Sequence, residues 1–313
     1  MKRVQAIAPY IHPGFLNFKM APYEAWQQIG GSIAKDHYPW RMFHGLAYRW
    51  EFPTLWKNKT EARLRFVEPV SISFDTFPDY ARYEIIPFVW DCWPCHFEKM
   101  CRWLTKHDVQ TAIFTSSQTA ERIKKRFPSI NVMFCPEGID IQKYGMGKLL
   151  KYRCVDAYEI GGIDRSWFKR RYPSQYAVLF NKAKDWPISD HWNYSNLLQN
   201  SKISIIFPKS DCVPEIAEGL ETLTQRYWEC MLSRMVMVGH APKELVDLIG
   251  YNPVIELNRE NAVEHISQIL SNIDDEKYQK FVNKNRQVAL EMGPWSIRMR
   301  QVVDWLKQMG YEV

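Results

Sequence analysis

Apolar residues along this chain of 313 residues fall into two kinds of pattern. Short, nearly continuous apolar runs are typical of buried β-strands, and stretches with apolar residues at helical spacing are typical of amphipathic helices. Because predicted helices follow most of the strand-like runs, we expect an α/β protein with doubly wound sheets. Strands are expected at residues 4–8, 67–74, 85–90, 109–115, 130–134, 154–160, 203–207, 235–238 and 253–257.

Several predicted helices have recognisable beginnings. Pro94 is expected in the first turn of a helix that runs to His107, because proline is favoured at that position. Ser116 or Ser117 is expected to cap a helix at residues 118–127. The stretch 15–59 is rich in Trp, Tyr and Pro and shows neither period, so no element is predicted there. Further helices are expected at residues 193–199, 243–249, 262–273, 276–291 and 296–309.

The length of the chain allows two domains, each with its own core. A linker is expected at residues 144–151, which contain Gly145 and Gly147. The first domain then comprises residues 1–150 and the second residues 151–292. A Gly-Pro break at residues 293 and 294 precedes the last predicted helix, which lies in a C-terminal segment, 293–313.

The stretch from Glu221 to Gly239, ETLTQRYWECMLSRMVMVG, predicts a tight loop, an amphipathic helix and a short buried strand. The N-terminus of a helix offers unpaired N–H groups and the positive end of a dipole, which suit a phosphate group. Glu229, further along the helix, can accept hydrogen bonds from a vicinal diol such as that of ribose. Amides for phosphate and a glutamate for sugar hydroxyls indicate a nucleotide-sugar site.

This stretch also resembles a known family. It looks like the E-x7-E segment of GT-B-fold retaining glycosyltransferases. The runs that carry this likeness are TQRYWE, SRMVMVGHAPKEL and GYNPVIEL. The resemblance is to the group-1, family-4-like kind that is found in bacterial polysaccharide, capsule and lipopolysaccharide assembly. It is good over residues 202–257, fainter over 109–144 and almost absent before residue 65. It implies a GT-B architecture, with two Rossmann-like doubly wound domains facing a central cleft and the segment 293–313 crossing back to the first domain.

The resemblance implies that a sugar moves from a nucleotide-diphosphate donor to a hydroxyl acceptor on a glycan or lipid-linked glycan, with retention at the anomeric carbon. It places Glu229 on the ribose hydroxyls and Glu221 on the hydroxyls of the donor sugar. Members of the family need no protein nucleophile, and neither a metal nor another cofactor is expected. Amides at residues 222–224 and a cation, Arg165 or Arg226, would stabilise the departing diphosphate.

The phosphate loop departs from the family in one respect, because no glycine follows Glu221. Either Gln225 and Arg226 contact the donor directly, or the phosphate site is altered. Arg226 could instead form a helical ion pair with Glu229. The loop that is expected to bind the donor therefore consists of Glu221, Thr222, Leu223, Thr224, Gln225 and Arg226.

Other candidate residues follow predicted strands. Gly162 lies in a glycine-rich turn where backbone can approach phosphate, and the resemblance makes Arg165 the best match for a basic residue that pairs with the diphosphate. His12 and Gly14 could face an acceptor, although a plain turn explains them equally well. No further residue of the first 60 is assigned.

Asp91 directly precedes a Cys-x-x-Cys-His sequence at residues 92–96, and His96 is its last residue. We interpret it as a strand-to-helix junction rather than a haem, redox or zinc motif, because no export signal or suitable fourth ligand accompanies it. Both residues are then expected to face the cleft, where either could position an acceptor hydroxyl or touch the donor sugar. A helix-capping role for Asp91 is an alternative.

The charge of the chain is uneven. The net charge of +6 arises entirely in residues 1–150, which hold 20 Lys and Arg against 14 Asp and Glu. Aromatic residues that look exposed lie among these cations, which suits an anionic membrane surface or a pyrophosphate-linked lipid; a solvated basic face is the alternative. Nucleic acid is not expected, since no binding motif accompanies the charge. The aromatic residues are Trp26, Tyr38, Trp40, Tyr48, Trp50 and Trp56.

The sequence predicts a cytoplasmic protein, with peripheral contact to the inner face of a membrane as one option. No apolar run is long enough to span a bilayer, no signal peptide is recognisable, and an odd number of cysteines, seven, fits a reducing compartment. Two other functions stay open: a nucleotide-sugar 2-epimerase on the same scaffold, and a non-catalytic GT-B-like binding module.

Overall fold

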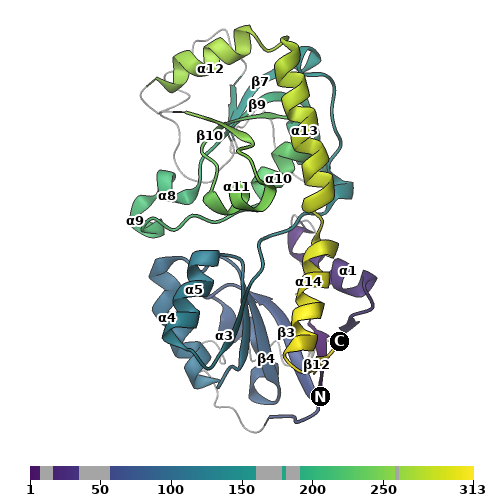
Figure 1. The fold of residues 1–313 in the computed structure, drawn as a ribbon, viewed down its shortest axis with the longest axis vertical. Coiled ribbons are helices and arrows are strands. Elements are labelled where there is room, and N and C mark those ends of the chain that lie inside the picture. Colours follow the sequence, from purple (N-terminus) through teal and green to yellow (C-terminus); the bar gives the residue numbers. More distant parts are fainter. Residues whose placement is uncertain (8–16, 35–56, 160–177, 181–190, 258–260) are drawn as a thin grey trace.

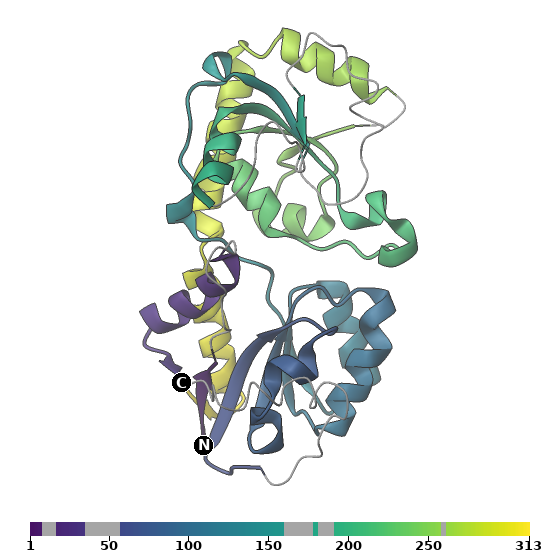
Figure 2. The ribbon, with the colours of Figure 1, turned by 180° about the vertical axis from the view of Figure 1, so that it is seen from behind.

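The computed structural model describes residues 1–7, 17–34, 57–159, 178–180, 191–257 and 261–313. They form two α/β bodies, one above the other in Figure 1, and the same arrangement is seen from behind in Figure 2. Every strand pairing in the described parts of both bodies is parallel. The predicted fold class, an α/β protein of doubly wound sheets, is confirmed.

The sheet of the first body has the strand order β12-β1-β3-β4-β5-β6, and β2 pairs with the outer side of β1. Its strands are β1 (Lys2–Ala6), β2 (Ser32–Ile33), β3 (Glu61–Val67), β4 (Glu84–Val89), β5 (Thr111–Phe114), β6 (Asn131–Phe134) and β12 (Tyr311–Glu312). Its helices are η1 (Asn17–Met20), α1 (Ala21–Gln28), α3 (Ile72–Thr76), η3 (Asp79–Ala81), α4 (Pro94–Lys106), α5 (Ser117–Arg126) and α14 (Trp295–Gln308).

The sheet of the second body has the order β11-β10-β9-β7-β8. Its strands are β7 (Val155–Glu159), β8 (Val178–Phe180), β9 (Ser201–Ile206), β10 (Val236–Gly239) and β11 (Val254–Glu256). The helices are α7 (His191–Asn200), α8 (Lys209–Cys212), α9 (Pro214–Ala217), α10 (Gln225–Leu232), α11 (Lys243–Ile249), α12 (Ala262–Ser271) and α13 (Glu276–Met292), and the connecting segment contains η4 (Ile141–Lys143) and η5 (Leu150–Tyr152).

One predicted strand was wrong. Residues 67–74 do not form a strand: β3 ends at Val67, and α3 follows at Ile72–Thr76. Pro69 lacks the N–H group that a strand interior requires. Strand β3 was not predicted at its full extent because Arg63 and Arg65 interrupt its apolar pattern, although both side chains are buried.

Trp26 also differs from its predicted exposure. Its side chain is fully buried beside the first sheet, and the indole Nε1 donates to the carbonyl of Ser32 at 3.0 Å. The other aromatic residues proposed for a membrane-facing surface, Tyr38, Trp40, Tyr48, Trp50 and Trp56, lie outside the described residues.

The chain passes between the bodies twice, and the two passages lie side by side. On the way out, the Ile139 N–H donates to the carbonyl of Gly293 at 2.8 Å; on the way back, the Trp295 N–H donates to the carbonyl of Ile139 at 3.2 Å. Helix α13 belongs to the upper body in Figure 1 and α14 to the lower one. Trp295, at the start of α14, stacks on Trp90 with the ring centroids 5.9 Å apart.

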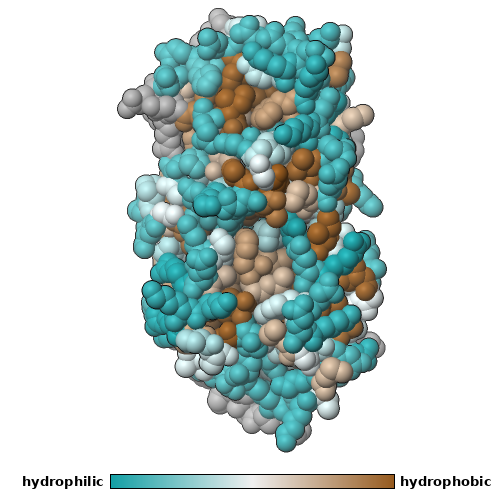
Figure 3. All heavy atoms as spheres, viewed as in Figure 1, coloured by the Kyte–Doolittle hydropathy of each residue, from teal (hydrophilic) through white to brown (hydrophobic). Residues whose placement is uncertain are grey.

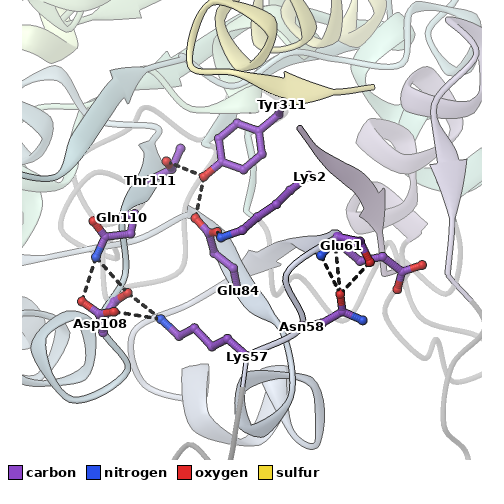
Figure 4. A network of polar contacts seen from close by, with 10 residues as sticks. Lys2, Lys57, Asn58, Glu61, Glu84, Asp108, Gln110, Thr111 and Tyr311 are labelled. Carbon is purple, nitrogen blue, oxygen red and sulfur yellow. Dashed lines mark hydrogen bonds and ion pairs between the residues drawn. The ribbon is translucent and has the colours of Figure 1, made fainter.

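A polar network ties the C-terminal strand β12 to the first sheet (Figure 4). The Tyr311 hydroxyl donates to Glu84 and lies 2.9 Å from the hydroxyl of Thr111. Glu84 also accepts from the ammonium group of Lys2. Because Glu84 is buried, these partners satisfy a carboxylate that would otherwise be costly to remove from water.

Hydrophilic side chains predominate on the face seen in Figure 3, and apolar side chains are visible where the two bodies meet. None of the helices in the described parts of the chain is long and apolar enough to cross a membrane.

Candidate functional site

A cavity of about 240 Å³ lies between the two bodies. Asp91 and Trp93 reach it from the loop after β4, while Lys209 reaches it from the segment after β9 and Arg226 from α10. In parallel doubly wound sheets, ligands bind beyond the carboxyl ends of the strands, and this cavity has that position. The full lining in the described chain is Asp91, Trp93, Ile206, Phe207, Pro208, Lys209, Cys212, Val213, Thr222, Thr224, Arg226 and Tyr227.

Two cations face this cavity from the second body. The Lys209 ammonium group lies 4.1 Å from the centre of the Trp93 ring, a cation–π contact between the bodies. The indole Nε1 of Trp93 donates to Asp91 Oδ1 at 3.1 Å, so one aromatic side chain contacts both a cation and a carboxylate. Arg226 is exposed toward the same space. The wall of the cavity therefore carries two cations, Lys209 and Arg226.

Asp91 is held in an unusual conformation at the first-body wall. Its φ of 49° lies in the left-handed region, which costs energy for a residue with a Cβ. The surrounding protein desolvates the carboxylate and raises its pKa, and the negative charge of Glu68 adds to the effect. Strained residues with perturbed acidity are common at functional sites.

The loop before α10 is fixed by groups from both bodies. The Glu221 N–H donates to Gln118 Oε1 at 3.1 Å, and the Thr222 hydroxyl donates to the carbonyl of Thr115 at 3.3 Å. The Leu223 N–H donates to Glu244 Oε2 at 2.8 Å, and the Leu223 side chain is fully buried. The prediction that Leu223 offers its amide to a phosphate is therefore not met in this structure, whereas Thr222 and Thr224 line the cavity.

A carboxyl group also lies at the first turn of α10. Glu137, from the segment after β6, accepts the Gln225 N–H at 3.1 Å, and its main-chain carbonyl accepts the Trp228 indole N–H at 2.9 Å. Burial of the Glu137 carboxyl, with the charge of Asp91 nearby, raises its pKa to about 8. A pKa raised in this direction reduces the negative charge of Glu137 beside Arg226 near neutral pH.

Glu229 lies behind the cavity rather than on its wall. The Tyr144 hydroxyl donates to its Oε1 at 2.8 Å, and the Tyr194 hydroxyl donates to its Oε2 at 2.6 Å. Burial raises the pKa of Glu229, while the two tyrosine hydrogen bonds oppose that shift. Each carboxylate oxygen has a second lone-pair direction, so both can accept a further hydrogen bond.

Glu221 is half-buried and faces the segment after β10. Its Oε2 accepts the Lys243 N–H at 3.4 Å, and its Oε1 lies 3.5 Å from His240 Nε2. Neither Glu221 nor His96 lines the cavity; His96 lies in the first turn of α4. The predicted residues His12, Gly14, Gly162 and Arg165 lie outside the described residues.

The arrangement was compared with known proteins. No protein-family model matches the sequence, and no curated protein sequence is similar to it. Solved structures do match: the chain aligns over 99% of its length with 99% of a sucrose-phosphate synthase from Thermosynechococcus elongatus, at a TM-score of 0.59 and 10% identity. The fold is that of the GT-B glycosyltransferases.

Two further GT-B structures align over nearly the whole chain. Anabaena HepE, solved in complex with UDP and glucose, has a TM-score of 0.60 and 10% identity; 98% of this chain is matched to all of HepE. A glycosyltransferase from Rickettsia africae has a TM-score of 0.57 and 9% identity, with 98% of each chain matched. Similarity at this level of identity establishes the fold.

The GT-B cavity contains residues that the sequence did not single out. Lys209 and Trp93 follow the strands β9 and β4, so the rule that ligands lie at carboxyl ends of strands could have pointed to them. Glu137 and Glu244 gave no such signal, because the partners Gln225 of Glu137 and Ser117 of Glu244 are 88 and 127 residues away in sequence. Among the described residues, no cluster of three or more His, Cys, Asp or Glu side chains is arranged to hold a metal ion.

Proposed function

We propose that this protein transfers a glycosyl group from a nucleotide-diphosphate sugar to a hydroxyl acceptor, with retention of the anomeric configuration. The observation that supports this most is the cavity between two parallel sheets, with Lys209 and Arg226 on its wall and helix α10 beginning beside it. Its GT-B neighbours include HepE structures in complex with UDP and glucose and with UDP-glucose.

In the proposed donor complex, the diphosphate lies between Lys209 and Arg226. The bond from the anomeric carbon to the phosphate oxygen breaks, the acceptor oxygen forms the new bond to that carbon, and the acceptor proton passes to the departing phosphate. Negative charge develops on the diphosphate during this step, and fixed cations lower the barrier by stabilising it. The proposed mechanism uses these cations and needs no divalent metal.

The remaining residues have proposed roles around this diphosphate. Glu229 accepts the ribose hydroxyls while it keeps its tyrosine partners, and Glu221 orients the donor sugar. Asp91, on the opposite wall, positions the acceptor hydroxyl, with His96 as a more distant candidate. The proposed acceptor is a glycan or a lipid-linked glycan, and the basic first half of the chain would give peripheral contact with an anionic membrane.

The first experiment measures binding. A panel of nucleoside diphosphates and nucleotide sugars is added to the protein, and thermal unfolding is followed; ligand at a hundredfold over Kd should add about 2.7 kcal/mol of stability. Lys209→Ala and Arg226→Ala should each raise the Kd of the preferred nucleotide about tenfold, the factor for ~1.4 kcal/mol. Lys280→Ala is the matched control, since Lys280 pairs with Glu276 on the surface of α13.

The second experiment identifies the products. Incubation with the preferred donor and a glycan acceptor should release free nucleoside diphosphate and a glycoside whose anomeric configuration matches the donor's. An epimerase would return a nucleotide sugar instead, and binding without any turnover would indicate a non-catalytic module. Equal nucleotide affinity in wild type, Lys209→Ala and Arg226→Ala would refute the proposed diphosphate position.

A further inference from the structure

One carboxylate connects the two bodies beside the cavity. Glu244, in the first turn of α11, accepts two hydrogen bonds at Oε1 from Ser117, one from the main-chain N–H at 2.7 Å and one from the hydroxyl at 2.8 Å. Its Oε2 accepts the N–H of Leu223 at 2.8 Å. Ser117 begins α5 of the first body, whereas Leu223 and Glu244 belong to the second.

The geometry differs from that of an ordinary helix cap. A glutamate in the first turn of a helix usually bonds to an N–H group of its own helix, but all three of these bonds leave α11. Ser116 already caps α5 through its side chain, which accepts the Thr119 N–H. The Ser117 N–H is therefore left for Glu244, and the positive dipole end of α5 favours the carboxylate there.

Glu244 determines the position of a loop that contributes to the cavity wall. Leu223 lies between Thr222 and Thr224, and both of these threonines line the cavity. The first body contacts the same loop at two more points, where Gln118 accepts the Glu221 N–H and the Thr115 carbonyl accepts the Thr222 hydroxyl. The conformation of residues 221–224 thus depends on contact between the bodies.

Apolar packing accompanies these hydrogen bonds. Trp93 of the first body forms a small buried cluster with Ala217 and Leu220 of the second. Leu220 directly precedes the loop, so the loop is fixed at its start by packing and in its middle by Glu244. Separation of the bodies would break the Ser117–Glu244 bonds and free one oxygen of the carboxylate that holds the Leu223 amide.

We propose that Glu244 is a positioning residue for the donor site: its carboxylate joins α5 to residues 221–224, so that the loop takes its binding shape only while the two bodies are in contact. The proposal rests on the proposed function for the identity of the ligand, a nucleoside diphosphate. Glu244 itself does not line the cavity and acts through Leu223 and the adjacent threonines.

Glu244→Gln tests the positioning role of Glu244 with little change in the shape of the side chain. Glutamine has one acceptor oxygen, so its NH2 group must face either the Ser117 or the Leu223 N–H. Hydrogen exchange of the backbone, measured by mass spectrometry, should become at least about tenfold faster, the factor for ~1.4 kcal/mol, in peptides that cover the start of α5 and residues 220–225. Ser117→Ala, which removes one bond only, should give a smaller increase in the same two peptides.

Asp247→Asn is the matched control. Asp247 lies one turn further along α11, where it is exposed and pairs with Lys243. Exchange in Asp247→Asn should equal that of wild type in both peptides. Unchanged exchange in the 220–225 peptide of Glu244→Gln would overturn the proposal, and so would faster exchange confined to α11.

Binding of UDP and GDP separates this proposal from the proposed function. Glu244→Gln should raise the Kd of the nucleotide that wild type binds about tenfold, with Ser117→Ala intermediate and Asp247→Asn unchanged. If wild type binds no member of the full panel of nucleoside diphosphates, the proposed function fails, and the exchange result alone decides whether Glu244 couples the bodies. If Glu244→Gln loosens the loop but binds nucleotide like wild type, the positioning role is refuted.

Discussion

At the scale of single residues, the cleft brings several carboxyl groups close to one arginine. Glu137, Asp91 and Glu229 all interact electrostatically with Arg226. If all three were ionised, their charges would cancel the attraction of Arg226 for a diphosphate. Desolvation raises the pKa of all three groups, and the rise of the Glu137 pKa to about 8 reduces that competition near neutral pH.

The first prediction concerns Glu137. Its pKa is raised from 4.5 to about 8 by burial, so between these pH values the folded protein holds a proton that the unfolded chain has lost. The free energy of unfolding should therefore fall as pH rises from 4.5 to 8, by at most about 1.4 kcal/mol per pH unit. Because the side chain is only half-buried, water should reduce this slope.

Glu137→Gln should remove this slope, since the amide does not titrate and its oxygen can still accept the Gln225 N–H. Urea unfolding of both proteins at several pH values from 5 to 9 measures the difference, with Glu98→Gln as the control because Glu98 pairs with Arg126 on the surface. Parallel pH profiles of wild type and Glu137→Gln would contradict the prediction.

At the scale of elements, β7, β9, β10 and β11 could be predicted because apolar residues predominate in or beside each of these strands, and β9, α10 and β10 lie within or beside the stretch 221–239. Strand β3 could not be predicted, because Arg63 and Arg65 interrupt its apolar pattern although both side chains are buried. Arg65 donates to the carbonyl of Ile7, and Arg63 pairs with Glu61. The partner of Arg65 lies 58 residues away, directly after the neighbouring strand β1, and no period in the sequence reveals it.

The second prediction concerns Gly239 at the end of β10. Its φ is 139°, and a Cβ there would lie 1.8 Å from the carbonyl oxygen of Ile206 in β9. Gly239→Ala must separate the two strands next to the cavity and should cost roughly 2–4 kcal/mol of stability. Gly250→Ala separates the cost of the steric clash from the cost of the backbone conformation. Gly250 also has a positive φ, 79°, but there is open space around its Cβ position.

Gly250→Ala should cost about 1–2 kcal/mol, the penalty of a left-handed backbone alone. Equilibrium unfolding in urea measures both variants, and nucleotide binding should weaken only in Gly239→Ala. A loss of stability no larger in Gly239→Ala than in Gly250→Ala would show that the strands can adjust to the clash.

At the scale of the whole molecule, the pattern of strands and helices predicted the α/β class, but the long-range polar contacts had no counterpart in the sequence pattern. Glu229 illustrates this: the segment 221–239 pointed to it, yet its partners Tyr144 and Tyr194 lie 85 and 35 residues away. The same is true of Tyr311, whose partner Glu84 is 227 residues away. Long-range polar pairs depend on how the elements pack, which short-range spacing does not encode.

The third prediction uses this long-range pair. Tyr311→Phe removes the hydroxyl that donates to Glu84 and contacts Thr111 (Figure 4), and Glu84 is left with Lys2 as its ion-pair partner. The buried carboxylate loses a hydrogen bond, so the free energy of unfolding should fall by about 1–3 kcal/mol. Tyr152→Phe, at a side chain that is 62% exposed, should be neutral in the same urea titration; equal stability of the two variants would contradict the assignment.

The paired passages at Ile139 and Trp295 limit how the cleft can open. Because the two connections bond to each other at one edge of the molecule, we expect the bodies to rotate about that edge as about a hinge rather than to slide past each other. Motion is then expected at the opposite edge of the cleft, where α8 and α9 lie across the molecule from the passages in Figure 1. Lys209 begins α8, so we expect such a motion to move its ammonium group away from the Trp93 ring, which would leave that charge free for the diphosphate of the proposed donor complex.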